Sequence, residues 1–268
     1  MAKSKNKPQK QFGWLKNLAI ALAAMGGIIA MQLFWPPSGS PLRKRNIASN
    51  EDLQRQEQQE ALRLQVLKAA PTFGFDNLIA DWTFLEFLEY FGDDDARNKT
   101  GYSLSGDYFD IVTKLNPRWV DIYLFVSNSL SIYEGKPKEG VEYMTRGVES
   151  LSPEIHPDAW LVPRYRGIDQ LLLVGDIEGS IASHELAAKW AEGTDDEQLV
   201  PLFENTAEFL RQDPDSKSIK INGWLWVYYQ TRDQRVRDRA TKELLELGVK
   251  KEEGEDGRVK FTVPESEE

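Results

Sequence analysis

The segment at residues 115–153, "LNPRWVDIYLFVSNSLSIYEGKPKEGVEYMTRGVESLSP", decides the fold of this chain. An Asn-Pro pair at 116–117 opens the segment, a Ser-Pro pair at 152–153 closes it, and a Gly/Pro turn at Gly135 divides it in two. Apolar residues recur at helical spacing in both halves. Because glycine and proline interrupt helices, the segment predicts two helices joined by a short turn.

Two glycines in this segment indicate a close contact between helices. Gly140 and Gly147 both fall in the second predicted helix, seven residues apart and on one face. Glycine inside a helix costs about 1 kcal/mol relative to alanine. Two glycines on one face therefore predict that another helix approaches them closely.

With these features the segment resembles a tetratricopeptide repeat. That family uses helix-turn-helix units of about 34 residues, with small residues at two positions of the second helix. Gly140 and Gly147 take those positions here. A second unit fits residues 158–193, where Gly175 is the turn glycine. Ser180 and Ala187 then hold the small positions.

The resemblance weakens on both sides of these two units. Residues 224–248 make a poorer third unit, with Val236 and Glu243 at the small positions. The stretch at 76–95 and residues 105–117 would form an earlier pair joined by a long loop. The resemblance implies an all-α fold in which helical hairpins stack into a short solenoid.

In this family the first helix of each pair lines a concave groove, which implies a protein-binding surface. The segment "WLVPRYRGIDQ" at 160–170 adds an aromatic and basic cluster, and such residues are favoured anchors of interfaces. The alternative is that these rings form the core between hairpins. The predicted protein-binding residues are Phe125, Ser129, Arg164, Tyr165, Asp169, Leu225 and Tyr228.

The stretch "DNLIADWTFLEFLEYFGDDD" at 76–95 reads as a helix that is apolar on most of its circumference. Projection gives two apolar arcs with Asp81 between them, which predicts a helix covered on two sides. Asp81 should then be partly buried and paired with an arginine, such as Arg164 or Arg166, or with backbone amides. This structural role is the main interpretation, and a role in binding or proton chemistry is the alternative.

The segment between Trp14 and Trp35 predicts a transmembrane helix at 15–35. Twenty residues that are apolar or tolerated in a membrane separate the two tryptophan rings. With a helical rise of about 1.5 Å per residue they span roughly 30 Å, the thickness of a bilayer core. A cleavable signal peptide is the rival interpretation, but Pro41 would follow the best cleavage site. Five lysines precede the span and three basic residues follow it, which favours a cytoplasmic amino terminus and a periplasmic or thylakoid-lumenal body.

The whole chain divides into five parts. A basic cytoplasmic tail (1–14) precedes the transmembrane helix, and a linker with an exposed Gln/Glu-rich helix follows at 36–70. The tetratricopeptide-like helical domain covers 71–248. A flexible acidic tail is predicted at 249–268, although its "RVKFTV" segment could add a short strand.

Charge and motifs exclude several classes of function. The first 50 residues carry eight basic and no acidic residues. Because the net charge of the chain is −10, the other 218 residues carry a charge of −18. Such an acidic body repels phosphate backbones, which argues against nucleic-acid binding. There is no cysteine, only two histidines, and no phosphate-binding or metalloprotease motif. We predict no metal site, no cofactor and no catalytic residue.

These observations predict a membrane-anchored, non-catalytic scaffold or assembly factor that binds protein partners. The chain is also similar to uncharacterised membrane-anchored cyanobacterial proteins with a "DNLIADWTFLEFLEYFGD"-like signature. One alternative is a fixed accessory subunit of a membrane complex, including a photosynthetic one. Another is an enzyme that acts on envelope material with carboxylates such as Asp81.

Overall fold

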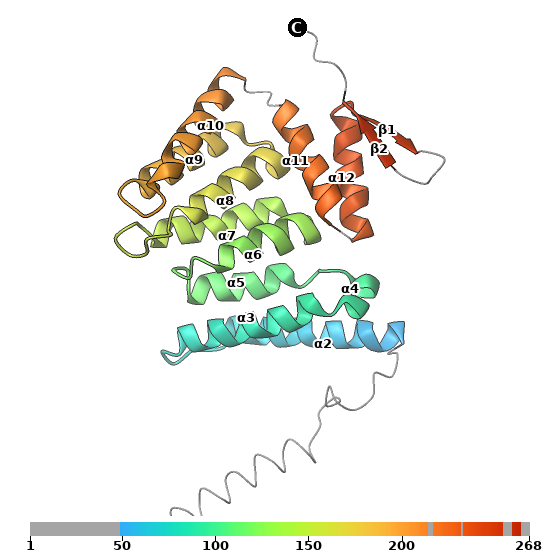
Figure 1. Ribbon diagram of the computed structural model, residues 1–268. Helices are drawn as coiled ribbons and strands as arrows, with labels where there is room; N and C mark the ends of the chain where they lie inside the picture. The colour runs from blue at the N-terminus through green and yellow to red at the C-terminus, as the bar shows by residue number, and fades with distance from the viewer. Residues whose placement is uncertain (1–48, 214–216, 232, 254–258, 264–268) are drawn as a thin grey trace, which may run out of the picture. The chain divides into compact units, whose positions relative to one another are not determined.

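The computed structural model describes residues 49–213, 217–231, 233–253 and 259–263 (Figure 1). The predicted transmembrane helix at 15–35, the basic tail before it and most of the linker after it lie outside these ranges. None of the helices within the described ranges is both long and apolar enough to cross a bilayer. Anchoring in a membrane therefore stays a prediction.

The all-α class is confirmed, because helices account for most of the described residues. In chain order the elements are α2 (Asn50–Ala69), α3 (Asp76–Gly92), α4 (Asp94–Thr100), α5 (Ser105–Leu115), α6 (Ile122–Phe125), the π-helix η1 (Val126–Glu134), α7 (Pro137–Ser150), α8 (Leu161–Asp169), the π-helix η2 (Gln170–Val174), α9 (Ile177–Ala191), the 3-10 helix η3 (Glu197–Leu199), α10 (Val200–Gln212), α11 (Lys217–Gln230), α12 (Gln234–Glu246), β1 (Lys250–Glu253) and β2 (Val259–Thr262).

Two helical hairpins share one turn geometry. α6 continues directly into η1 and α8 into η2, and each π-helix ends at a glycine in the left-handed conformation. Gly135 has φ 82° and Gly175 has φ 80°. The Gly135 amide donates to the Leu130 carbonyl, and the Gly175 amide donates to the Gln170 carbonyl, 40 residues further on. Only glycine adopts this backbone without strain, which is why these two residues end the first helix of each hairpin.

The helices of the two hairpins pack against their neighbours in chain order (Figure 1). α3 packs on α5, α5 on α7, α7 on α8, α8 on α9 and α9 on α10. α10 is not among the predicted hairpins, although Phe203, Ala207 and Leu210 give it a buried face at helical spacing. α11 and α12 pack on each other and contact η2 and η1, so this pair lies across the ends of both π-helices.

Close contact between helices is present at both predicted small positions of α7. A Cβ added at Gly140 would lie 2.2 Å from Ser131 Oγ, and one added at Gly147 would lie 2.5 Å from Tyr123 Cζ. Tyr123 is fully buried, and its hydroxyl donates to the Pro117 carbonyl at 2.8 Å. α7 therefore lies against α6 and η1 with no room for a side chain at either glycine.

α3 is covered on one side only. Phe84 and Phe87 are buried, and Phe84 makes edge contacts with the rings of Trp119 and Phe125. The other apolar arc, formed by Leu78, Trp82 and Leu85, is exposed.

The prediction that Asp81 is partly buried and paired is therefore wrong. Asp81 is exposed, and it makes no hydrogen bond or ion pair with any residue that the structure describes. The expected cover over the second arc of α3 is absent from the described chain, so the helix face that carries Asp81 points to solvent. Hydrophobic periodicity located both arcs but could not tell which one a neighbour covers.

The carboxyl-terminal segment contains an antiparallel strand pair where a flexible tail was predicted. β1 pairs with β2 in a register that sets Lys251 opposite Phe261. The Phe261 ring packs on Tyr228 of α11, with centroids 4.8 Å apart. The strand predicted in "RVKFTV" is β2, whereas the polar composition of β1 concealed it.

Candidate functional site

An apolar groove of about 640 Å³ lies among the first helices of the two hairpins and α11. Its walls come from α6 and η1, from α8 and η2, and from one face of α11, with single residues from α9 and α10. Leu124 and Trp226 line it and remain exposed. The full lining is Leu124, Ser127, Asn128, Ile132, Arg164, Ile168, Asp169, Leu171, Leu172, Leu173, His184, Thr206, Ile219, Gly223, Trp226 and Val227.

The shape of the groove depends on how closely α11 approaches η2. A Cβ added at Gly223 would lie 2.6 Å from a methyl group of Leu172, so α11 packs directly on that leucine. Leu171 is buried beside it, and Leu173 packs into the core between α11 and α12. Three consecutive leucines of η2 therefore all reach the groove, which a helix face of regular period would not predict.

Asp169 is an acid buried in the groove wall without a cation. Its side chain is 1% exposed, and Oδ1 accepts a hydrogen bond from Ser127 Oγ at 2.6 Å. Within the described part of the chain it forms no ion pair. Burial raises the pKa of Asp169 to about 7, although the hydroxyls of Ser127 and Ser131 favour its ionised form. The groove therefore holds a carboxyl group that is partly protonated near neutral pH.

His184 and Arg164 supply the other ionisable groups of the groove. Nδ1 of His184 lies 2.8 Å from the Ser180 carbonyl, and since a carbonyl can only accept, Nδ1 carries the proton. Burial lowers the pKa of His184, which keeps its ring neutral. Arg164 is half-buried, with its guanidinium 5.8 Å from the centre of the Phe203 ring. The site is thus mainly apolar, with one acid, one cation and one neutral imidazole.

Two of the seven predicted binding residues line the groove, Arg164 and Asp169. Ser129 is buried and donates to the Phe125 carbonyl, one turn earlier. Phe125 and Tyr165 pack on the main core. The aromatic alternative, in which the rings form the core between hairpins, describes these residues better than a groove surface does.

The last two predicted binding residues belong to a different core. Leu225 and Tyr228 pack in the cluster between α11 and α12. The residues of α11 that line the groove are Ile219, Gly223, Trp226 and Val227. The predicted register of the third unit therefore does not identify the face of α11 that lies towards η2.

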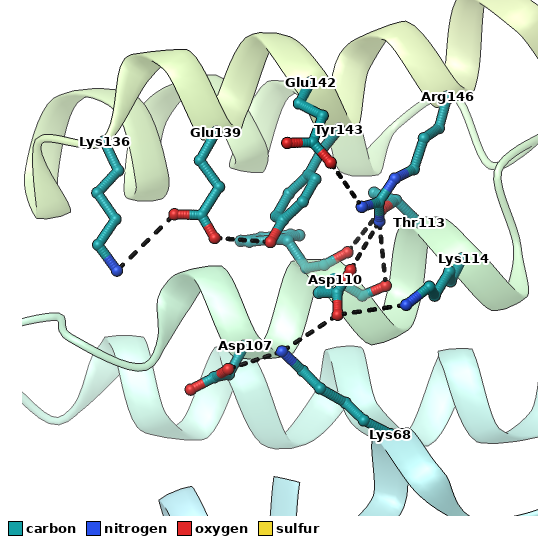
Figure 2. Close-up of polar contacts among 11 residues, drawn as sticks. Lys68, Asp107, Asp110, Thr113, Lys114, Lys136, Glu139, Glu142, Tyr143 and Arg146 are labelled. Carbon is teal, nitrogen blue, oxygen red and sulfur yellow. Dashed lines mark hydrogen bonds and ion pairs between the residues drawn. The ribbon is translucent and has the colours of Figure 1, made fainter. Parts of the chain in front are cut away.

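A second polar cluster joins α2, α5 and α7 (Figure 2). Lys68 pairs with Asp107 at 2.7 Å and with Asp110 at 3.1 Å, and Arg146 reaches the other oxygen of Asp110 at 2.9 Å. Lys114 adds a weaker contact to Asp110 at 3.7 Å. Burial works to raise the pKa of Asp110, but hydrogen bonds from Arg146 and Lys68 outweigh it and lower the pKa. A paired acid of this kind is a poor proton acceptor at neutral pH, so the cluster fits a structural role that holds three helices together.

No family model, curated protein or solved structure matches this chain significantly. The described residues also contain no group of three or more acidic or histidine side chains placed to hold a metal ion. Function is therefore inferred from the chemistry of the groove and from the sequence.

Proposed function

We propose that this chain is a membrane-anchored, non-catalytic scaffold or assembly factor that binds an apolar segment of a protein partner in its groove. The observation that carries the proposal is the apolar groove between the two hairpins and α11. Its volume of about 640 Å³ is that of a typical binding cleft. Of its two exposed rim residues, Leu124 and Trp226, the tryptophan is of a kind that contributes strongly to interfaces.

We infer a tetratricopeptide-like stacking of the hairpins, which supports the same function. The two turns 40 residues apart, the small residues on α7 and the contacts between successive helices are those of stacked helical hairpins. In such folds the first helices present one surface to ligands. Here the first helices of both hairpins supply most of the groove wall.

Anchoring at a membrane would make weak binding effective. The proposed helix at 15–35 holds the body near membrane proteins, which raises its effective concentration there. We place the amino terminus in the cytoplasm and the body in the periplasm or thylakoid lumen. Protease added outside sealed right-side-out plasma-membrane vesicles should therefore cleave a periplasmic body, whereas a lumenal body should be cleaved only in inside-out thylakoid vesicles. The opposite pattern in either membrane would contradict this orientation.

The proposal is tested by isolating the full-length chain from its native membranes in a mild detergent. Trp226→Glu places a charge in the groove, while Tyr229→Glu places the same charge three residues away on α11, outside it. The two side chains are 61% and 60% exposed, so neither change introduces a charge into the buried core, and Tyr229→Glu removes only the edge contacts with Tyr228 and Phe261. We expect a protein, identified by mass spectrometry, to be lost from the Trp226→Glu sample and kept with Tyr229→Glu.

The amount of that protein separates the two non-catalytic forms of the proposal. A transient assembly factor would carry its partner below one copy per chain, and a fixed accessory subunit would carry one copy. If the wild-type chain and the Trp226→Glu and Tyr229→Glu variants carry identical partners, the groove is not the binding site. The exposed position of Asp81 does not favour the catalytic alternative, because no described residue is placed to activate it.

A further inference from the structure

The uncovered side of α3 forms a continuous apolar surface, which we call the α3 outer face. It consists of Phe73 and Phe75 in the loop before α3, and Leu78, Trp82 and Leu85 on the helix. From Phe75 onward these residues follow a spacing of three, four and three, so their side chains form one stripe. All five are between 59% and 83% exposed.

Exposed apolar residues are concentrated in this part of the described chain. Of the sixteen large apolar side chains that are exposed there, eight lie between Leu62 and Leu88. Scattered exposed residues are ordinary, but a contiguous patch marks a surface that meets something apolar. The terminal layer of a stack of hairpins normally has a polar outer side. The α3 outer face is therefore too apolar for a terminal layer that is exposed to water.

The loop before α3 holds its most exposed ring at a cost in backbone energy. Phe73 has φ 51°, which makes it the one non-glycine residue with positive φ among the residues described. Its side chain is 83% exposed, so no packing within the described chain offsets the strain. Strained residues of this kind are concentrated at functional sites. The strain at Phe73 is explained if the ring enters an apolar phase outside the protein.

We propose that the α3 outer face lies on the surface of the bilayer in which the amino-terminal segment is anchored. This inference rests on the anchoring part of the proposed function. Only residues 36–49 separate Trp35 from α2, and these fourteen residues reach at most about 50 Å. The tether therefore holds the start of α2 within about 50 Å of the anchored segment, so the bilayer is within reach of the α3 outer face. Tryptophan, phenylalanine and leucine are the side chains that enter the boundary between headgroups and acyl chains.

Charge at the edge of the face selects the kind of lipid. Asp81 is exposed on α3 beside the stripe, Glu89 takes the next position of the stripe after Leu85, and Asp76 begins the helix. Carboxylates at this edge disfavour an anionic surface. The contact is therefore apolar rather than electrostatic, so it occurs on uncharged lipid and does not weaken in high salt.

The absence of cysteine allows a direct test with single labels on the full chain. Leu78→Cys and Leu202→Cys each carry one nitroxide, in chains reconstituted into phosphatidylcholine vesicles. Leu78 is 63% exposed on α3, and Leu202 is 53% exposed on α10, so the two are matched in residue type and exposure. We expect lipid-soluble oxygen to relax the label at 78 more than a water-soluble nickel chelate does. The label at 202 should show the reverse order.

Further arms separate the explanations. Adding Trp82→Glu to the Leu78→Cys chain should shift the label at 78 to the aqueous pattern, and 1 M salt should leave the pattern of the chain without Trp82→Glu unchanged.

If the chain floats with the vesicles but the label at 78 behaves like that at 202, lipid contact is overturned while anchoring stands. If the label is shielded only in native membranes, the face binds protein and the proposal fails. If the chain does not float with vesicles, both the anchor and the lipid contact are refuted.

Discussion

The two hairpins have the same backbone turn but different surroundings. Gly135 and Gly175 have nearly equal φ values and end π-helices of the same kind. A Cβ added at Gly175 would meet nothing within 4 Å, whereas one at Gly135 would lie 2.3 Å from the guanidinium of Arg239. Arg239 comes from α12 and donates hydrogen bonds to the Ile132 and Glu134 carbonyls. The first turn therefore contacts α12 through Arg239, whereas the glycine of the second turn makes no such contact.

The hairpins also differ at the equivalent positions 129 and 169. Ser129 is buried and satisfies its hydroxyl within its own helix, at the Phe125 carbonyl. Asp169 is as deeply buried, but it reaches across to Ser127 of the first hairpin. Two hairpins with the same backbone turn therefore have different buried polar groups at equivalent positions. The first hairpin supports the packing of α12, and the second places an acid between the hairpins in the wall of the groove.

The largest expected difference is in the pH dependence of stability caused by Asp169. Its pKa is raised to about 7, so between about pH 4 and pH 7 the folded state binds a proton that the unfolded state has released. Stability from this group is therefore full at low pH and falls by about 1.4 kcal/mol per pH unit until pH 7 is passed. Asp169→Asn should remove this decline, which amounts to roughly 3 kcal/mol between pH 5 and pH 8.

Urea unfolding of the solubilised chain at several pH values measures this effect. Ser129→Ala is the matched control, because it changes the equivalent buried position without altering a titratable group. Burial also raises the pKa of Glu134, so some decline should remain in the Asp169→Asn variant. Asp110 has a lowered pKa and loses its contribution only below about pH 4. Parallel pH profiles for wild type and Asp169→Asn would refute the assignment.

A second prediction concerns how tightly the first hairpin is packed. Gly147→Ala should destabilise the chain by about 2 kcal/mol, because the new methyl group would meet the buried and hydrogen-bonded ring of Tyr123. Gly92→Ala is the control, since a Cβ there meets nothing within 4 Å. It should leave the urea midpoint unchanged or raise it slightly. Equal effects of the two substitutions would show that α7 does not lie as close to α6 as described.

The smallest expected effect separates the two turns. Gly135→Ala and Gly175→Ala should each cost about 1 kcal/mol, because alanine disfavours the left-handed conformation. Gly135→Ala should cost about 1 kcal/mol more, since it displaces Arg239 from its two carbonyl partners. The measured quantity is the difference between the unfolding free energies of the Gly135→Ala and Gly175→Ala variants. This difference should vanish when each substitution is made separately in an Arg239→Ala background, and its persistence there would contradict this explanation.

The sequence was sufficient for features that depend on nearby residues. Turn glycines at 135 and 175, helical spacing on either side of them, and small residues at 140 and 147 together predicted two hairpins and their close packing. Each of these signals acts within one hairpin, so it can be read without knowing the rest of the fold. α10 was missed although Phe203, Ala207 and Leu210 offered the same kind of spacing.

The groove and the open side of α3 depend on contacts between distant segments. The groove exists because Gly223 lets α11 pack on Leu172, and no local pattern connects residues 51 positions apart. On α3, both apolar arcs have helical spacing, and only the positions of α5 and of the rings of Trp119 and Phe125 decide that Phe84 and Phe87 are the buried ones. Periodicity finds apolar faces, but tertiary packing determines which face is covered.

The central claim is that the groove receives an apolar segment of a protein partner. The most direct test introduces a photo-crosslinking phenylalanine derivative at position 226 or at position 229 of the full chain in its native membrane. Both positions are exposed on α11, and only Trp226 lines the groove. We predict a discrete crosslinked product from position 226 and none from position 229. Equal products from both positions, or none from position 226, would contradict the claim.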